Sequence, residues 1–117
     1  MIKNDTTGTV LWNDFELANT PLSRMRGLMF RLRMTKPLLF EFPRVCRVEA
    51  SVHMFFVFFP IDLIYLDENK RIVDLKENFK PFSINYTPRA PVKYLIEAPV
   101  HSISLLGLEL GQKLSWP

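Results

Sequence analysis

The chain has 117 residues, of which 48% are hydrophobic, and a formal charge of +3 at neutral pH. This composition excludes a disordered chain, and the modest charge, without a long basic stripe, disfavours a protein specialised for nucleic acid. The single cysteine, Cys46, excludes an intrachain disulfide and a cysteine-rich zinc site. We expect one domain spanning residues 1–117, soluble and in the reducing cytoplasm, because the N-terminus also lacks the apolar segment of a signal peptide.

The N-terminal third is predicted to form a hairpin, a helix and a strand. Two β-prone runs, 9–12 and 15–18, are separated by an Asn-Asp pair that suits a tight hairpin turn. A Thr-Pro pair typical of a helix start then precedes apolar residues at helical spacing, which predicts a short helix over about 21–30. The apolar run 38–42 lies between two prolines and predicts a strand that ends at both of them.

The middle of the chain is the most apolar part and predicts core strands. Segment 45–51 is compatible with a strand or a loop. The runs 52–59 and 61–66 are rich in β-branched and aromatic residues, which indicates strands covered on both faces, and the proline between them bends or breaks the pair. A polar turn then leads into a strand over 71–75, which closes a second hairpin.

The C-terminal part predicts a long loop and three short elements. The loop covers 78–91, and the alternating run 92–97 is typical of a strand. Pro99 can begin a second helix that Gly107 ends, and a last strand begins at Gln112. The chain therefore predicts a mainly β, α+β fold: a compact antiparallel β-sandwich or open barrel with two short helices.

Three stretches, taken in order, resemble one family. They are Thr20 to Arg31, His53-Met54 followed by Phe59 to Asp67, and Tyr94 to Glu97 with Leu106 to Gly111. Together they are similar to the family called domain of unknown function 192, also known as uncharacterised protein family 0127, in its short archaeal form. The resemblance implies a compact, mainly β domain found in bacteria and archaea, with no established activity, cofactor or partner.

The most specific part of the resemblance is the run Arg26 to Met29 combined with the later run Pro60 to Asp62. One stretch departs from the commoner pattern. Many members have tryptophan, methionine, lysine, asparagine and threonine before the proline, whereas this chain has His53 to Val57. A mechanism that used the missing asparagine and threonine therefore cannot be transferred to this chain.

Four polar residues in these stretches are the candidate binding residues: Arg26, His53, Asp62 and Glu97. His53 begins an apolar strand, where it either makes one structural hydrogen bond or serves as a ligand or proton-transfer group. Asp62 lies between isoleucine and leucine and must find a cation or backbone amides; Arg26 is the preferred partner. Glu97 either caps the second helix or joins His53 and Asp62 in a cluster.

The leading hypothesis is a non-enzymatic domain that binds a small molecule or protein partner in a cleft bordered by these four residues. One alternative is an enzyme in which His53 and Asp62 form an acid-base pair, and another is an oligomerising interaction module with exposed aromatic residues. Histidine, cysteine and acidic residues lack the usual metal-ligand spacing, so we predict no metal and no cofactor. The apolar stretch 53–67 is too short and too interrupted to span a membrane.

Overall fold

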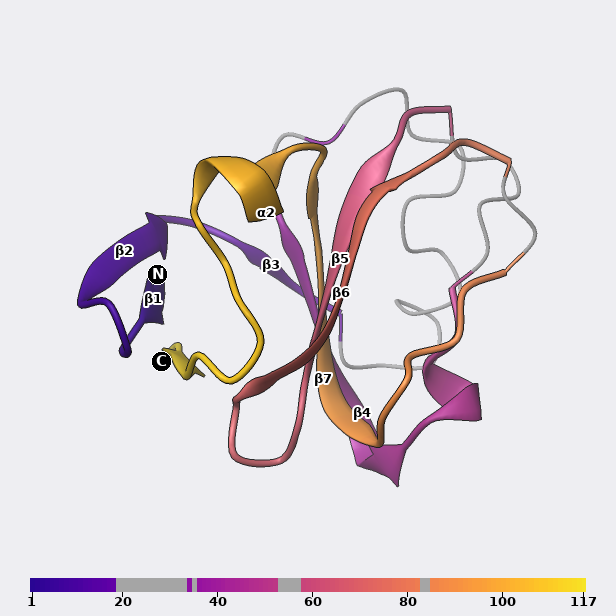
Figure 1. Cartoon of the computed structure of the whole chain (residues 1–117), viewed down its shortest axis with the longest axis horizontal. Coiled ribbons are helices and arrows are strands. Elements are labelled where there is room, and N and C mark those ends of the chain that lie inside the picture. The colour runs from indigo at the N-terminus through magenta and orange to yellow at the C-terminus, as the bar shows by residue number, and fades with distance from the viewer. Residues whose placement is uncertain (19–33, 35, 53–57, 83–84) are drawn as a thin grey trace.

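The computed structural model describes residues 1–18, 34, 36–52, 58–82 and 85–117. Within these residues the chain forms a three-stranded sheet of order β2-β1-β8 and a five-stranded sheet of order β3-β4-β7-β5-β6 (Figure 1). The strands are β1 (Ile2–Asn4), β2 (Thr9–Trp12), β3 (Glu16–Leu17), β4 (Leu38–Cys46), β5 (Ile61–Leu66), β6 (Ile72–Phe79), β7 (Val92–Pro99) and β8 (Leu114–Ser115). A 3-10 helix, η1 (Val48–Ala50), and a short α-helix, α2 (Ser102–Leu105), complete the described elements.

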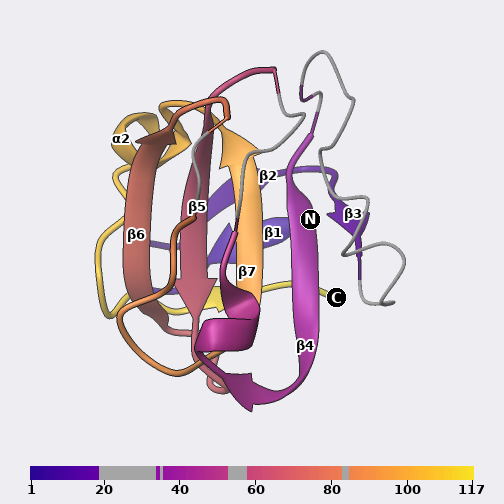
Figure 2. The ribbon, with the colours of Figure 1, turned by 90° about the vertical axis from the view of Figure 1, so that its right-hand side faces the viewer.

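The five-stranded sheet is built around β5, which pairs antiparallel with β6 on one side and with β7 on the other. All six residues of β5 are buried, because both faces of the sheet are covered. Figure 2 shows β6 at one edge of the sheet and β4 toward the other, with η1 lying over one face. The predicted core strand over 61–66 and the hairpin that follows it are therefore confirmed.

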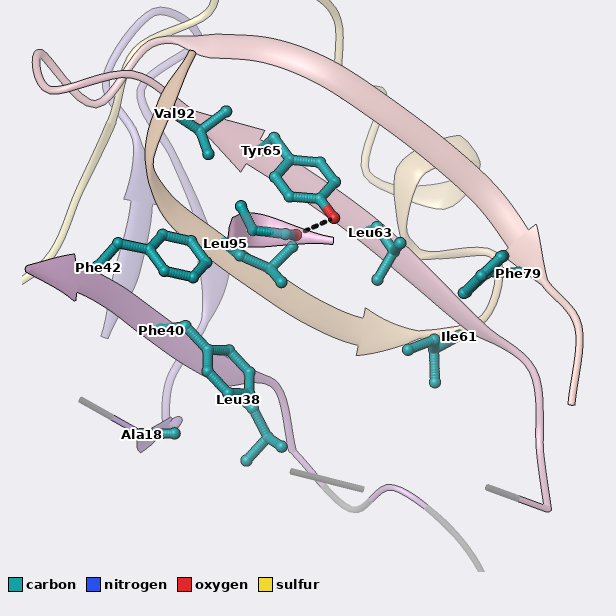
Figure 3. Close-up of a cluster of buried hydrophobic side chains, with 11 residues drawn as sticks. Ala18, Leu38, Phe40, Phe42, Ile61, Leu63, Tyr65, Phe79, Val92 and Leu95 are labelled. Carbon is teal, nitrogen blue, oxygen red and sulfur yellow. Dashed lines mark hydrogen bonds between the residues drawn. The ribbon is translucent and has the colours of Figure 1, made fainter. Parts of the chain in front are cut away.

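Side chains alternate between the two faces along β5, as the period of a strand requires. Leu63 and Tyr65 point to a face that we call the aromatic face, where phenylalanine and leucine side chains from β4, β6 and β7 join them (Figure 3). Ile64 and Leu66 point to the opposite face, which we call the helix face. In Figure 1 the helix face lies toward α2 and the small sheet, and the aromatic face lies toward η1 and the loop after β6.

The three-stranded sheet packs on the helix face and joins the two ends of the chain. β1 pairs antiparallel with both β2 and β8, so Ile2 and Leu114 enter the same apolar cluster. The buried side-chain amide of Asn4 donates to Gln112 at 3.0 Å, which ties the N-terminal strand to the last turn. The prediction of a mainly β, sandwich-like α+β fold is confirmed, and the described strands do not close into a barrel.

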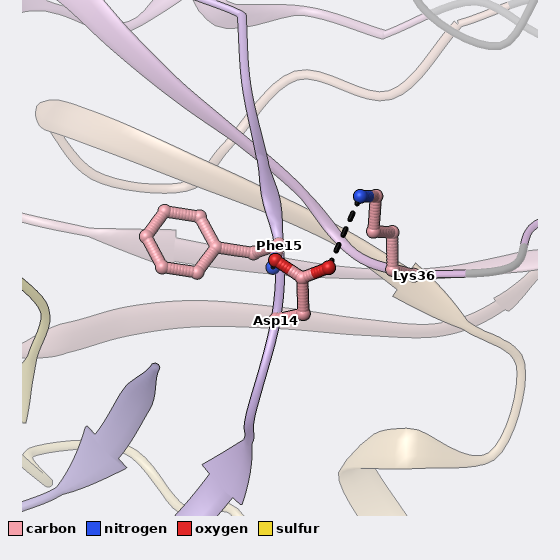
Figure 4. Close-up of polar contacts among 3 residues, drawn as sticks. All are labelled: Asp14, Phe15 and Lys36. Carbon is pink, nitrogen blue, oxygen red and sulfur yellow. Dashed lines mark hydrogen bonds and ion pairs between the residues drawn. The ribbon is translucent and has the colours of Figure 1, made fainter.

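The predicted hairpin between 9–12 and 15–18 is wrong. β2 pairs instead with β1, across a turn in which Gly8 has a φ of 76° that glycine adopts readily, and β3 crosses to the other sheet to pair parallel with β4. Asp14 does not form a hairpin turn: it accepts a hydrogen bond from the amide of Phe15 and pairs with Lys36 at 3.1 Å (Figure 4). Asp14 thus lies at the surface, in the connection between β2 and β3.

β4 also differs from the prediction, because it continues through Pro43 to Cys46. The pairing of β4 with β7 is interrupted between Glu41 and Cys46, so the missing N–H of Pro43 removes no ladder hydrogen bond. The ambiguous segment 45–51 contains the end of β4 and η1.

The strand predicted over 52–59 is not formed at its described ends. Val52 makes only an isolated bridge with Tyr86, and Phe58 and Phe59 lie outside any strand, while residues 53–57 lie outside the described residues. The helix predicted over 21–30 also lies outside them.

The C-terminal elements follow the prediction closely. β6 extends beyond the predicted 71–75 to Phe79, and β7 covers the predicted strand 92–97. The short helix α2 precedes Gly107, whose φ of 63° belongs to the left-handed region that ends helices. The last strand, β8, follows the turn at Gly111.

Candidate functional site

Asp62 is fully buried in β5 and makes two hydrogen bonds to backbone amides. One carboxylate oxygen, Oδ1, accepts from the amide of Asn78 at 2.9 Å, and the other, Oδ2, accepts from the amide of Ile103 in α2, also at 2.9 Å. Backbone amides thus satisfy this carboxylate, one of the two solutions that the sequence left open. The preferred partner, Arg26, lies outside the described residues.

Glu97 lies in β7, where it is directly opposite Leu38 of β4 and Leu63 of β5, and only 6% of it is exposed. This register places Glu97 on the aromatic face, whereas Asp62 lies opposite Ala98 and points to the helix face. The structure therefore separates Glu97 and Asp62 by the sheet. The carboxylate at the N-terminal end of α2 is that of Asp62 rather than that of Glu97.

The other two predicted binding residues, Arg26 and His53, lie outside the described residues, and their binding roles stay predictions. Among the residues that are described, no group of three histidine, cysteine or acidic side chains is placed to hold a metal ion.

A hollow that the sequence did not predict opens on the aromatic side of the molecule, where β6 ends and the following loop begins. It has a volume of about 360 Å³ and is lined by Lys76, Asn78, Phe79, Lys80, Asn85 and Tyr86. We call it the Lys76 hollow. Its lining combines two ammonium groups, two side-chain amides and two aromatic rings, and none of the lining residues is acidic.

Tyr86 is fixed in this lining by contacts on several sides. Its ring stacks on that of Tyr65 at 6.2 Å between centroids and meets the ring of Phe79 edge-on at 6.0 Å. Its hydroxyl donates a 2.7 Å hydrogen bond to Asp74, which also accepts from the amide of Arg89. Burial and, next, the bond to Asp74 raise the pKa of Tyr86 to about 12, so the phenol is neutral at physiological pH.

Lys76 is half-buried, and its ammonium lies 5.8 Å from the centroid of the Tyr86 ring. It belongs to the aromatic face, because it is directly opposite Leu63. None of the ion pairs among the described residues involves Lys76. Asp74, the acidic residue next to it on this face, already accepts hydrogen bonds from Tyr86 and two backbone amides. The lysine is therefore a partly desolvated cation in a lining that contains no acidic residue.

The sequence did contain a signal for this site. Along β6, Asp74 and Lys76 occupy consecutive positions of the face that apolar residues fill in the neighbouring strands. Polar residues at core-facing positions of a strand are uncommon and mark either a buried network or a site.

Comparison with known proteins places the chain in a family. The family model DUF192, described as "Uncharacterized ACR", matches residues 2–116. The chain belongs to the DUF192 family. A UPF0127 protein of Thermococcus gammatolerans is 42% identical over 116 residues, covering 99% of this chain and 74% of its own. The UPF0127 protein of Pyrococcus furiosus is 39% identical and covers 97% of this chain and 95% of its own.

Two crystal structures share the DUF192 fold seen here. A putative transcription regulator from Sinorhizobium meliloti superposes with a TM-score of 0.79 at 29% identity, over 86% of this chain and 79% of that one. A protein of unknown function from Novosphingobium aromaticivorans gives a TM-score of 0.80 at 24% identity, over 87% and 74% of the two chains. Within the described residues of this DUF192 chain, none of the helices combines the length and the apolar character that crossing a membrane requires.

Proposed function

We propose that this DUF192 chain binds a small organic anion in the Lys76 hollow. The observation that carries the proposal is Lys76 itself, a half-buried ammonium in the lining that pairs with no carboxylate among the described residues. Partial burial of a cation costs free energy unless an opposite charge accompanies it. A bound anion would supply that charge.

The rest of the lining defines the class of ligand. The side-chain amides of Asn78 and Asn85 offer further donors to a carboxylate or phosphate, while Phe79 and Tyr86 offer apolar surface to a flat group. A volume of about 360 Å³ lies in the range of small-molecule sites. The ligand is therefore a small metabolite with one anionic end and one flat, apolar end.

The four residues predicted from the sequence relate to this site in different ways. Glu97 shares the aromatic face with Lys76, and Leu63 of β5 lies between them in the same cross-strand row. For Arg26 and His53, which lie outside the described residues, a binding role stays a prediction. The single cysteine supports a reducing compartment, so we propose that binding takes place in the cytoplasm.

The acid-base alternative finds no support in the geometry of Asp62. A general base must reach its substrate's proton through open space or one water molecule. Asp62 is 0% exposed, and each of its two oxygens accepts a backbone amide.

A second candidate function, an interaction module, is favoured by one exposed aromatic pair. The rings of Phe58 and Phe82 meet edge-on at 5.4 Å, yet the two residues are 48% and 53% exposed. Aromatic residues are enriched in the cores of protein interfaces. Sedimentation of the wild type and of Phe82→Ser would test this role: a dimer that the substitution dissociates would support it, and a monomer at all concentrations would argue against self-association.

The proposal is tested with two probes of equal shape, benzoate and its neutral analogue benzamide. Ligand-observed NMR should show saturable binding of benzoate and much weaker binding of benzamide. Lys76→Gln should weaken benzoate binding by about tenfold, because it removes one charged contact. Lys70→Gln is the matched control: Lys70 also lies over an aromatic ring, that of Trp116 at 4.3 Å, but it does not line the hollow. Equal affinities for benzoate in both variants would refute the proposal.

A further inference from the structure

The hollow is bordered by a distortion of the sheet at Asp62. The register between β5 and β6 shifts there, so that Asp62 lies opposite two residues of β6, Glu77 and Asn78. Two residues opposite one is the arrangement of a β-bulge, which bends its strand and redirects side chains, and such bulges are common beside active sites. The residues on either side of this bulge, Lys76 and Phe79, both line the Lys76 hollow, as does Asn78 itself.

Asn78 has a backbone conformation that needs support. Its φ is 49°, in the left-handed region, which costs free energy for a residue with a side chain, although asparagine tolerates it better than most. Its amide donates to the side-chain oxygen Oδ1 of Asp62, in the neighbouring strand β5, at 2.9 Å. The second oxygen of Asp62 is held by the amide of Ile103, so the carboxylate is fixed from the helix face while it holds the bulge.

We infer that Asp62 is a positioning residue for the Lys76 hollow, acting through the backbone of Asn78; this inference rests on the proposed function. Asp62 never touches the ligand, because it is fully buried and points to the other face of the sheet. Its carboxylate fixes the left-handed backbone conformation of Asn78. This conformation determines the positions of the Lys76 ammonium and the Asn78 side-chain amide in the hollow.

A carboxylate is required at this position because both partners are N–H donors. An asparagine in its place offers one carbonyl oxygen, and its own amide group would face one of the two backbone amides. Asp62→Asn therefore repels one of the two backbone amides, and the turn of the side chain that relieves this repulsion displaces the other bond, so the bulge loses support in either orientation.

The first experiment compares Asp62→Asn with Ile103→Ala. The second variant removes apolar packing at the same place in α2 but keeps the backbone amide that Asp62 binds. Both variants should be less stable than the wild type. At a temperature where both are folded, benzoate affinity should fall on the order of tenfold in Asp62→Asn alone. An equal loss in both variants, or in neither, would overturn the inference.

A second pair of variants tests the same inference without touching the buried carboxylate. Asn78→Gly and Asn78→Ala both remove the side-chain amide, but only glycine adopts the positive φ without strain. Asn78 is exposed, so both variants should fold. Benzoate should bind several-fold more weakly to the alanine variant than to the glycine variant, since the difference isolates the backbone conformation. Equal affinities would contradict the role of the bulge.

The failure of the inference differs visibly from the failure of the proposed function. If the wild type does not bind benzoate, the proposal that the hollow binds a small organic anion is refuted. The positioning role is then measured by amide spectra without ligand: Asp62→Asn should shift the resonances of Lys76, Asn78 and Asn85, and Ile103→Ala should leave Lys76 and Asn85 unchanged. Unchanged hollow resonances in Asp62→Asn would overturn the inference on their own.

Discussion

Replacing Tyr65 by phenylalanine should destabilise the fold by a predictable amount. Tyr65 is fully buried at the centre of the aromatic face, and its hydroxyl donates a 2.9 Å hydrogen bond to the carbonyl of Ala50 in η1 (Figure 3). The bond holds η1 onto the sheet. Burial raises the pKa of the Tyr65 phenol, which agrees with a hydroxyl shielded from water.

The magnitude follows from what the substitution leaves behind. Tyr65→Phe keeps the ring and its packing, so no large cavity forms, but the buried carbonyl of Ala50 loses this donor. A buried acceptor left without a partner costs about 1–2 kcal/mol of unfolding free energy. For a chain of this length, that corresponds to a fall in melting temperature of roughly 4–8 °C.

The assay is urea denaturation monitored by circular dichroism, which gives the free energy of unfolding. The slope of this free energy against urea concentration should be the same in all variants. Tyr94→Phe is the matched control, because the Tyr94 hydroxyl makes no hydrogen bond among the described residues and the residue is only half-buried. The control should change stability by less than about 0.5 kcal/mol. If Tyr65→Phe were as stable as this control, the bond to Ala50 would not hold η1, and the reasoning would be refuted.

Two further predictions concern titrating groups. Because the pKa of Tyr86 is raised to about 12 from 10.0, its neutral form contributes stability that is complete below pH 10 and is lost as the pH rises toward 12. Asp74→Asn should therefore lower the Tyr86 pKa in an ultraviolet titration, and an unchanged value would show that the bond to Asp74 does not contribute. The hydrogen bond from Lys36 lowers the pKa of Asp14 from 3.8, so Asp14 favours the fold above that pH and this contribution disappears as acid protonates it. Lys36→Gln should raise the Asp14 pKa in a carboxyl carbon NMR titration with only a small fall in the melting temperature at neutral pH, because an exposed ion pair contributes little to stability; a large fall would contradict a surface role.

Local patterns in the sequence predicted the elements that depend on neighbouring residues. β5, β6 and their turn follow from an apolar run, a polar turn and another β-prone run, all within 61–79. Strand pairing between segments that are distant in the chain could not be predicted from one sequence. β2 and β3 are close in the chain and β-prone, yet each pairs with a different sheet, because their partners are β1 and β4.

In the candidate site, too, local features were predictable from the sequence and long-range pairing was not. Asp62 and Glu97 stood out as carboxylates in apolar strands, and both are buried. Which face each one takes depends on the pairing of Asp62 with Ala98, and a shift of one residue would reverse it. The Lys76 hollow depends in addition on the loop after β6 that brings Tyr86 over the sheet, and no local pattern encodes that approach.

Lys76 is the proposed charged contact for a small organic anion, and a protein-observed titration tests this contact. Amide spectra of the wild type should be recorded with increasing benzoate and, separately, benzamide. With benzoate, saturable shifts should concentrate at Lys76, Asn78 and Asn85, and with benzamide the shifts should be far smaller. Shifts that do not saturate, that lie outside the hollow, or that are equal for the two probes would contradict it.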